Sequence, residues 1–179
     1  MALRGQKVFL MLLALAWGAV VPARADEACV DFKWDVGKER ALFTGTPAAA
    51  TAGKDAESAP AVVPNRLYSV RLTVQDGVKF QVSPAAKIAG TSAHAGLVTL
   101  KIPAPGSYRI SVDLPLWIDV VSNGQLVAAS DFQGQHDCAA PHKIVQFDLA
   151  GARPLVVQLS NAASDSVLLT VTPSPQRKL

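Results

Sequence analysis

Residues 107–130 read SYRISVDLPLWIDVVSNGQLVAAS, and they carry the clearest fold signal in the chain. Apolar and polar residues alternate from Tyr108 to Asp113, which is the period of a strand with one buried face. One apolar run precedes Asn123-Gly124 and another follows it. An Asn-Gly pair between two such runs is a strong hairpin signal, because both residues tolerate the positive φ of a tight turn. The stretch therefore predicts one strand followed by a hairpin.

The same two-residue period recurs on both sides of this stretch. Residues 67–74 alternate in the same way, and Asp76-Gly77 after them predicts another hairpin with residues 78–82. Turn residues separate the remaining runs, and no helical period follows residue 64. The pattern predicts an all-β fold, an antiparallel, jelly-roll-like β-sandwich of about eight or nine strands over residues 65–173, with a short tail over 174–179. The further runs are 96–102, 143–149, 155–160 and 167–172.

The first 25 residues resemble an export signal. Two cations precede an apolar run, and small residues around Arg24 form an A-x-A cleavage pattern. The run is short for a membrane-spanning helix, which needs about 20 residues, so an uncleaved anchor is the alternative. No later stretch is apolar for long enough to span a bilayer. We therefore expect residues 1–25 to be a signal peptide and the protein to be periplasmic or secreted.

Export changes the charge of the protein. The chain has 17 Lys and Arg residues against 14 Asp and Glu residues, and the signal peptide removes three cations and no acid. The exported chain is then formally neutral. No basic patch interleaved with aromatic residues remains, so the sequence does not indicate a nucleic-acid partner.

Residues 26–64 precede the expected sandwich. Residues 26–43 predict a short helix, and residues 44–64, rich in Ala, Thr, Gly and Pro, predict a linker. The helix would turn one apolar side inward and its charged residues to water. The apolar side comprises Trp34, Val36, Leu42 and Phe43, and the charged residues are Lys38, Glu39 and Arg40.

The chain has two cysteines, Cys29 and Cys138. An oxidising compartment favours a disulfide between them, which would fasten the N-terminal segment to the far end of the domain. The alternative is a reactive or metal-binding Cys138 beside His136.

Histidines and an acid are concentrated in the segment 131–143. His136 and His142 with a carboxylate could hold iron in a non-haem arrangement. A site needs three or four converging ligands, so a solvated polar loop with a bridged cysteine is the simpler interpretation.

Trp117 and Asp119 share one face of their predicted strand. An acid among apolar residues needs a partner, and Lys143 or Arg109 could supply it. Asp119 could bind a ligand with Trp117 as a stacking platform, or it could form a structural ion pair beside a packed tryptophan.

Three elements occur together within residues 95–172: Tyr108-Arg109, the run from Trp117 to Val121, and Asp137-Cys138. On these elements the stretch resembles a family of small exported proteobacterial proteins of unknown role. Some members carry a homogentisate 1,2-dioxygenase label, which implies a small metal-dependent oxygenase that uses iron. The strand cadence is also similar, more weakly, to bacterial pre-peptidase C-terminal domains, which are accessory β-sandwich modules. Neither resemblance carries over a catalytic residue.

The sequence contains none of the short catalytic signatures G-x-S-x-G, H-E-x-x-H, P-loop or C-x-x-C. We therefore expect an exported, non-catalytic binding or accessory module, with the oxygenase as the alternative function. Its partner would be a glycan, a peptide or an envelope protein. Binding would involve Trp117, Asp119, Lys143 and the loop from Phe132 to His142, which includes His136.

Overall fold

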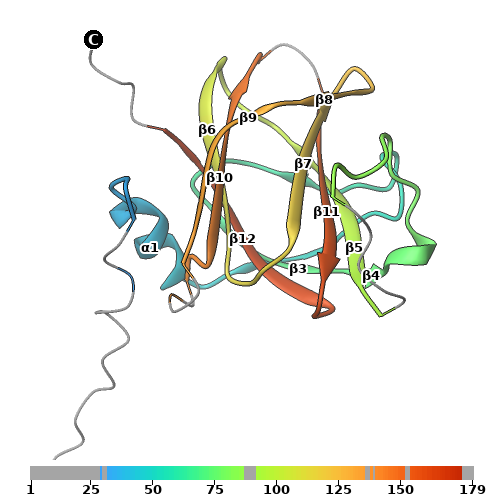
Figure 1. Cartoon of the computed structure of the whole chain (residues 1–179), viewed down its shortest axis with the longest axis horizontal. Coiled ribbons are helices and arrows are strands. Elements are labelled where there is room, and N and C mark those ends of the chain that lie inside the picture. The colour runs from blue at the N-terminus through green and yellow to red at the C-terminus, as the bar shows by residue number, and fades with distance from the viewer. Residues whose placement is uncertain are drawn as a thin grey trace, which may run out of the picture.

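The computed structural model describes residues 29, 32–86, 92–135, 138, 140–151 and 154–174. These residues form two β-sheets that face each other, with one helix outside them (Figure 1). The prediction of an all-β fold is confirmed. The expected signal peptide, residues 1–25, lies outside the described residues. Within the ranges given above, no helix is long and apolar enough to cross a membrane.

The elements follow one another along the chain as helix α1 and strands β1 to β12. Sheet A has the strand order β1-β3-β12-β6-β10-β9, and sheet B has the order β2-β5-β11-β7-β8, with β4 also paired to β5. Their bounds are α1 Gly37–Phe43, β1 Ala48–Thr51, β2 Ala61–Val62, β3 Leu67–Arg71, β4 Thr73–Val74, β5 His94–Leu100, β6 Gly106–Val112, β7 Trp117–Ser122, β8 Gln125–Val127, β9 Ala129–Gly134, β10 Lys143–Leu149, β11 Leu155–Ala162 and β12 Ser166–Pro173.

Both sheets are mixed, which corrects the prediction of a purely antiparallel fold. β1 pairs parallel with β3 in sheet A, and β2 pairs parallel with β5 in sheet B. β1 and β2 lie within residues 44–64, where the sequence predicted a linker. A parallel pair needs a long crossover connection, and here the chain between β1 and β3 crosses to sheet B and forms β2 on the way. The jelly-roll-like order stays a prediction.

The two predicted hairpins have different outcomes. Asn123 and Gly124 have φ angles of 52° and 71°, and they join β7 to β8 as predicted. The other prediction was wrong: Gln75–Gly77 form a 3₁₀ turn, and residues 78–82 form no strand. These residues instead cross the outer face of sheet B, where Val78, Phe80 and Val82 pack on a small apolar cluster of Leu97, Val121 and Val156.

The main core lies between the sheets and takes side chains from both. Ile118 and Val120 point into it, whereas Val121 points to the outer face of sheet B, as the alternation in the sequence predicted. Fully buried members from other strands include Val70, Ile110, Leu159 and Leu169.

The buried side chain of Gln158 helps to hold the segment that covers sheet B. The Gln158 side chain is fully buried, and its Oε1 accepts hydrogen bonds from the backbone N–H groups of Gln81 (2.8 Å) and Val82 (3.3 Å). Its Nε2 donates to the Val82 carbonyl at 3.0 Å. The side chain therefore replaces the backbone ladder that a strand at 78–82 would have made.

We expect Gln158→Leu to release this covering segment. The variant removes the hydrogen bonds from Gln158 to the backbone of Gln81 and Val82, and each such bond contributes about 0.5–1.5 kcal/mol of stability. Hydrogen exchange should accelerate at those two amides. Gln125→Leu on exposed β8 is the matched control, and unchanged exchange at residues 81 and 82 in Gln158→Leu would contradict this account.

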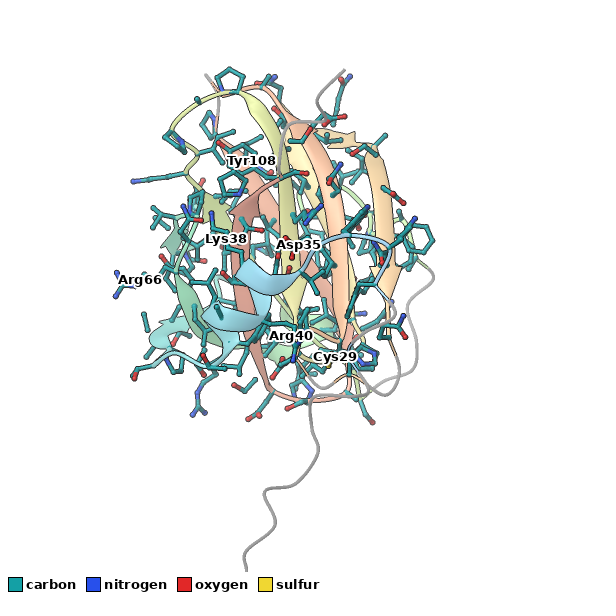
Figure 2. All side chains as sticks on the ribbon, turned by 90° about the vertical axis from the view of Figure 1, so that its left-hand side faces the viewer. Cys29, Asp35, Lys38, Arg40, Arg66 and Tyr108 are labelled. Carbon is teal, nitrogen blue, oxygen red and sulfur yellow. A yellow bond between two sulfur atoms is a disulfide. The ribbon has the colours of Figure 1, made fainter. Side chains whose placement is uncertain are left out.

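The N-terminal segment covers the outer face of sheet A, opposite the core. Figure 2 looks onto this face and shows α1 lying across the sheet, with Cys29 near its lower edge. The predicted disulfide is confirmed: Cys29 and Cys138 are bonded, with 4.9 Å between their Cα atoms. The bridge fixes the start of the described chain beside the strands that flank Cys138.

Glu39 differs from its prediction as a solvated residue. Its side chain is buried under α1, because Arg109 on β6 and Thr172 on β12 provide partners for its carboxylate there. Burial of a charge is tolerated where it is paired and hydrogen-bonded. Glu39 therefore attaches the helix to sheet A.

Candidate functional site

A cavity of about 580 Å³ lies between the two sheets, where the chain passes from β8 in sheet B to β9 in sheet A. Its walls come from β7, β8, β9 and β10, from the turn before β7, and from Ala85 in the segment that covers sheet B. The position and the lining of the cavity follow from the way in which β7 and β8 in sheet B separate from β9 and β10 in sheet A.

Incomplete pairing opens the cavity. β8 pairs with β7 only at residues 120–122, so residues 117–119 have no partner in β8. The chain then leaves sheet B, and β9 pairs with β10 with a register shift in which Ser130 has no partner. An unpaired extra residue of this kind bends the strand that carries it. The bend and the short β8 leave a gap between β7 and β9.

The interior of the cavity is apolar, and its rim is aromatic and exposed. Ile118, Val145 and Phe147 are nearly fully buried and form the deep wall. Trp117 and Phe132 at the rim are 38% and 67% exposed. Exposed aromatic side chains beside an apolar hollow are typical of a ligand site.

Lys143 brings a positive charge to this cavity. It is the first residue of β10 and shares a face with Val145 and Phe147, both of which belong to the core. Its Nζ donates to the Leu116 carbonyl at 2.8 Å and lies 4.9 Å from the centroid of the Trp117 ring. Burial lowers the pKa of Lys143, and the charge of Asp119 opposes that shift in part.

Asp119 on β7 also lines the cavity, and both of its oxygens accept hydrogen bonds. Trp117 Nε1 donates to Oδ1 at 3.0 Å, and the Ala85 amide donates to Oδ2 at 3.1 Å. The carboxylate therefore orients the Trp117 indole and holds the end of the covering segment. Of the two partners expected from the sequence, Lys143 is near it and Arg109 is not.

Arg109 belongs to a separate cluster on the outer face of sheet A. Its Nη1 lies 3.6 Å from Glu39 Oε1 and donates to the Asp35 carbonyl at 2.9 Å. Its guanidinium lies 4.6 Å from the centroid of the Trp34 ring. These contacts attach the N-terminal segment to the sheet and do not reach the cavity.

Of the two histidines proposed from the sequence as ligands, the structure describes only one. His142 lines the cavity beside Lys143, and His136 lies outside the described residues. Cys138 is held in the disulfide, so it is not a free thiol. Among the residues that are described, no three His, Cys, Asp or Glu side chains gather as metal ligands. The iron site therefore stays a prediction.

Trp117, Asp119, His142 and Lys143, four of the five binding residues proposed from the sequence, thus line one cavity. Sequence analysis missed its apolar walls, which include Leu116, Leu126, Val127, Val145 and Phe147. One signal was available: Lys143 stands in phase with the apolar residues of its own strand, which places a cation on a core-facing side.

We expect Lys143→Met to fold and to be at least as stable as the wild type at neutral pH, because it removes a partly desolvated cation. The pKa of Lys143 is lower in the folded protein than its ordinary value of 10.5. Between these two pKa values the unfolded state binds more protons, so wild-type stability rises with pH. Thermal unfolding measures this effect. From neutral pH to about pH 10, the melting temperature of the wild type should rise relative to that of the variant, whose pH dependence lacks this contribution. A melting temperature of the wild type that falls relative to that of the variant over this pH range would contradict the burial of the Lys143 amine.

Comparisons with known proteins extend this description little. No family model and no curated protein matches the chain. Among solved structures, the beta-glucosidase from Kluyveromyces marxianus in complex with glucose is similar to part of it, with a TM-score of 0.33 and 10% sequence identity. The match covers 47% of this chain and 10% of that chain. The fold and the site themselves define a two-sheet β protein with an apolar cavity between its sheets.

Proposed function

We propose that the protein is a non-catalytic binding module that holds a small, mainly apolar ligand between its sheets. The observation that carries this proposal is the cavity of about 580 Å³, with its apolar walls and aromatic rim. Ligand pockets are typically about 300–1,000 Å³, mostly apolar, with a few polar groups that orient the ligand. Lys143 and His142 are polar groups of that kind here.

The chemistry of the wall favours such a ligand over a glycan. A sugar would need several hydrogen-bonding side chains around the stacking tryptophan. Here one face of Trp117 has the Lys143 ammonium 4.9 Å from its centroid, and Asp119 accepts hydrogen bonds from Trp117 and Ala85. Apart from Gln133 and His142, the remaining side chains of the walls are aliphatic and aromatic.

We further propose that the module works after export, in the periplasm or outside the cell. The disulfide between Cys29 and Cys138 supports this location, because such bonds persist in oxidising compartments. The signal-like residues 1–25 support it independently. Membership of the exported proteobacterial family stays a prediction.

A neutral fluorescent probe tests the proposed function. N-phenyl-1-naphthylamine fluoresces in apolar sites, and we expect it to bind the purified protein saturably, at one site per chain. Val127 lines the cavity and is half-buried, so Val127→Phe should fill the space and weaken probe binding by about tenfold or more. The fold should survive, because the added ring enters an existing hollow.

Val74→Phe is the matched control, since Val74 is 52% exposed on β4 and does not line the cavity. It should bind the probe as the wild type does. Equal loss in both variants, or no saturable binding by the wild type, would overturn the proposed function.

A further inference from the structure

We propose that the ligand is a small carboxylate with an apolar body, whose carboxylate binds the Lys143 ammonium while its body fills the cavity. This inference rests on the proposed function and specifies the chemical class of the ligand.

Lys143 lies on the core side of sheet A. Its neighbours in register are Val112 on β6 and Gly134 on β9. Residues directly opposite each other in an antiparallel pair share a face of the sheet, so Lys143 lies on the inner face. Gly134 has no side chain to cover it on the side of β9. The lysine therefore lies at the cavity wall, next to the gap between β7 and β9.

The ammonium group of Lys143 keeps hydrogen-bond donors for a ligand. A lysine ammonium has three N–H donors, and the Leu116 carbonyl accepts one of them at 2.8 Å. The Trp117 ring provides a cation–π contact rather than a hydrogen-bond acceptor of comparable strength. Within the described part of the chain, the ion pairs are Lys33–Asp131 and Arg109–Glu39, and neither involves Lys143.

The nearby acid, Asp119, is engaged by other partners. Asp119 shares the outer face of β7 with Trp117, where its oxygens accept from Trp117 Nε1 and the Ala85 amide. It influences Lys143 through space without neutralising it by contact. Lys143 is thus a partly desolvated cation with donors to spare beside an apolar hollow.

The single charge of Lys143 favours a carboxylate as the anion. A charge-assisted hydrogen bond from a desolvated ammonium is among the stronger polar contacts in proteins. One lysine matches the single charge of a carboxylate, whereas a phosphate group would bring about −1.5 to −2 charges at neutral pH. The apolar walls then select a carboxylate that carries a ring or a short hydrocarbon chain.

The test uses two probes with the same apolar body, 4-phenylbutanoate, whose head group is a charged carboxylate, and 4-phenylbutanamide, whose head group is a neutral amide. Each competes with N-phenyl-1-naphthylamine for the wild-type protein at neutral pH. We expect the carboxylate to bind about tenfold or more tightly than the amide. Its affinity should fall as the pH rises and Lys143 loses its proton, while the affinity of the amide stays constant.

Two variants separate the roles of charge and cavity. Lys143→Met should bind both compounds equally and still bind the fluorescent probe. Lys101→Met, which removes an exposed lysine that does not line the cavity, should keep the preference for the carboxylate.

The possible failures are distinguishable. Equal affinities in the wild type, a preference that persists in Lys143→Met, or displacement by neither compound would overturn the carboxylate assignment and leave the cavity as a binding site. Absence of probe binding to the wild type would overturn the proposed function and this inference together.

Discussion

Replacing both Cys29 and Cys138 with serine is expected to lower the free energy of unfolding by about 4–5 kcal/mol. The disulfide closes a loop with a sequence separation of 109 residues, and a loop of that size loses much of its conformational freedom in the unfolded chain. Equilibrium denaturation of the wild type and the double variant, under oxidising conditions, measures the difference.

The same bond also has a local effect on the folded protein. It keeps the N-terminal segment close to β9, where the Lys33 amide donates to Gln133 Oε1 at 2.8 Å. We therefore expect faster hydrogen exchange at Lys33 in the double variant. Adding a reductant should destabilise the wild type and leave the variant unchanged. Equal stabilities of the two proteins would contradict a structural role for the disulfide.

Truncating Arg109 to alanine is expected to cost about 3–5 kcal/mol, because it leaves the buried Glu39 carboxylate without its cationic partner. Arg109 and Glu39 have side chains only 7% and 3% exposed, and their charged groups are 3.6 Å apart. The variant also removes the hydrogen bond to the Asp35 carbonyl and the stacking on Trp34. Thermal or denaturant unfolding provides the measurement.

A double variant distinguishes the buried charge from the loss of packing. Arg109→Met combined with Glu39→Leu removes both charges and retains most of the apolar volume, so it should recover much of the lost stability. Lys38→Ala, on the same helix but exposed, is the control and should change stability little. An Arg109→Ala variant as stable as Lys38→Ala would show that the ion pair does not attach the helix to sheet A.

The elements that could be predicted from the sequence are those that local residues determine. Asn123-Gly124 specify a turn with positive φ, so the hairpin of β7 and β8 followed from two residues. Asp76-Gly77 carry a similar signal, yet the chain after them packs on sheet B, because Gln158 and an apolar cluster lie there. That competition involves residues about 80 positions apart, so no local pattern could reveal it.

The edge strands β1 and β2 were not predicted, for a different reason. β1 reads AAAT, and alanine has little preference for strands. Its pairing with β3 is parallel and depends on a crossover through sheet B. Composition alone therefore favoured a linker. The burial of Glu39 was missed in the same way, since its partners Arg109 and Thr172 come from distant strands.

The candidate site was partly predictable. Trp117, Asp119 and Lys143 attracted attention because charged and aromatic residues interrupt apolar strands. The cavity itself depends on where β8 ends and where β9 bends, which sets the distance between two sheets. Strand periodicity does not encode that distance, so the hollow could not be predicted from the alternation of residues.

The most direct test of the central claim is a methyl NMR titration with N-phenyl-1-naphthylamine. If the ligand enters between the sheets, the methyl signals of Ile118, Val127 and Val145 should shift together and saturate. The methyl signals of Val62 and Val70, in the core beside the opposite edges of the two sheets, should stay in place. Shifts confined to exposed side chains, or equal shifts at Val62 and Val70, would contradict a ligand site between the sheets.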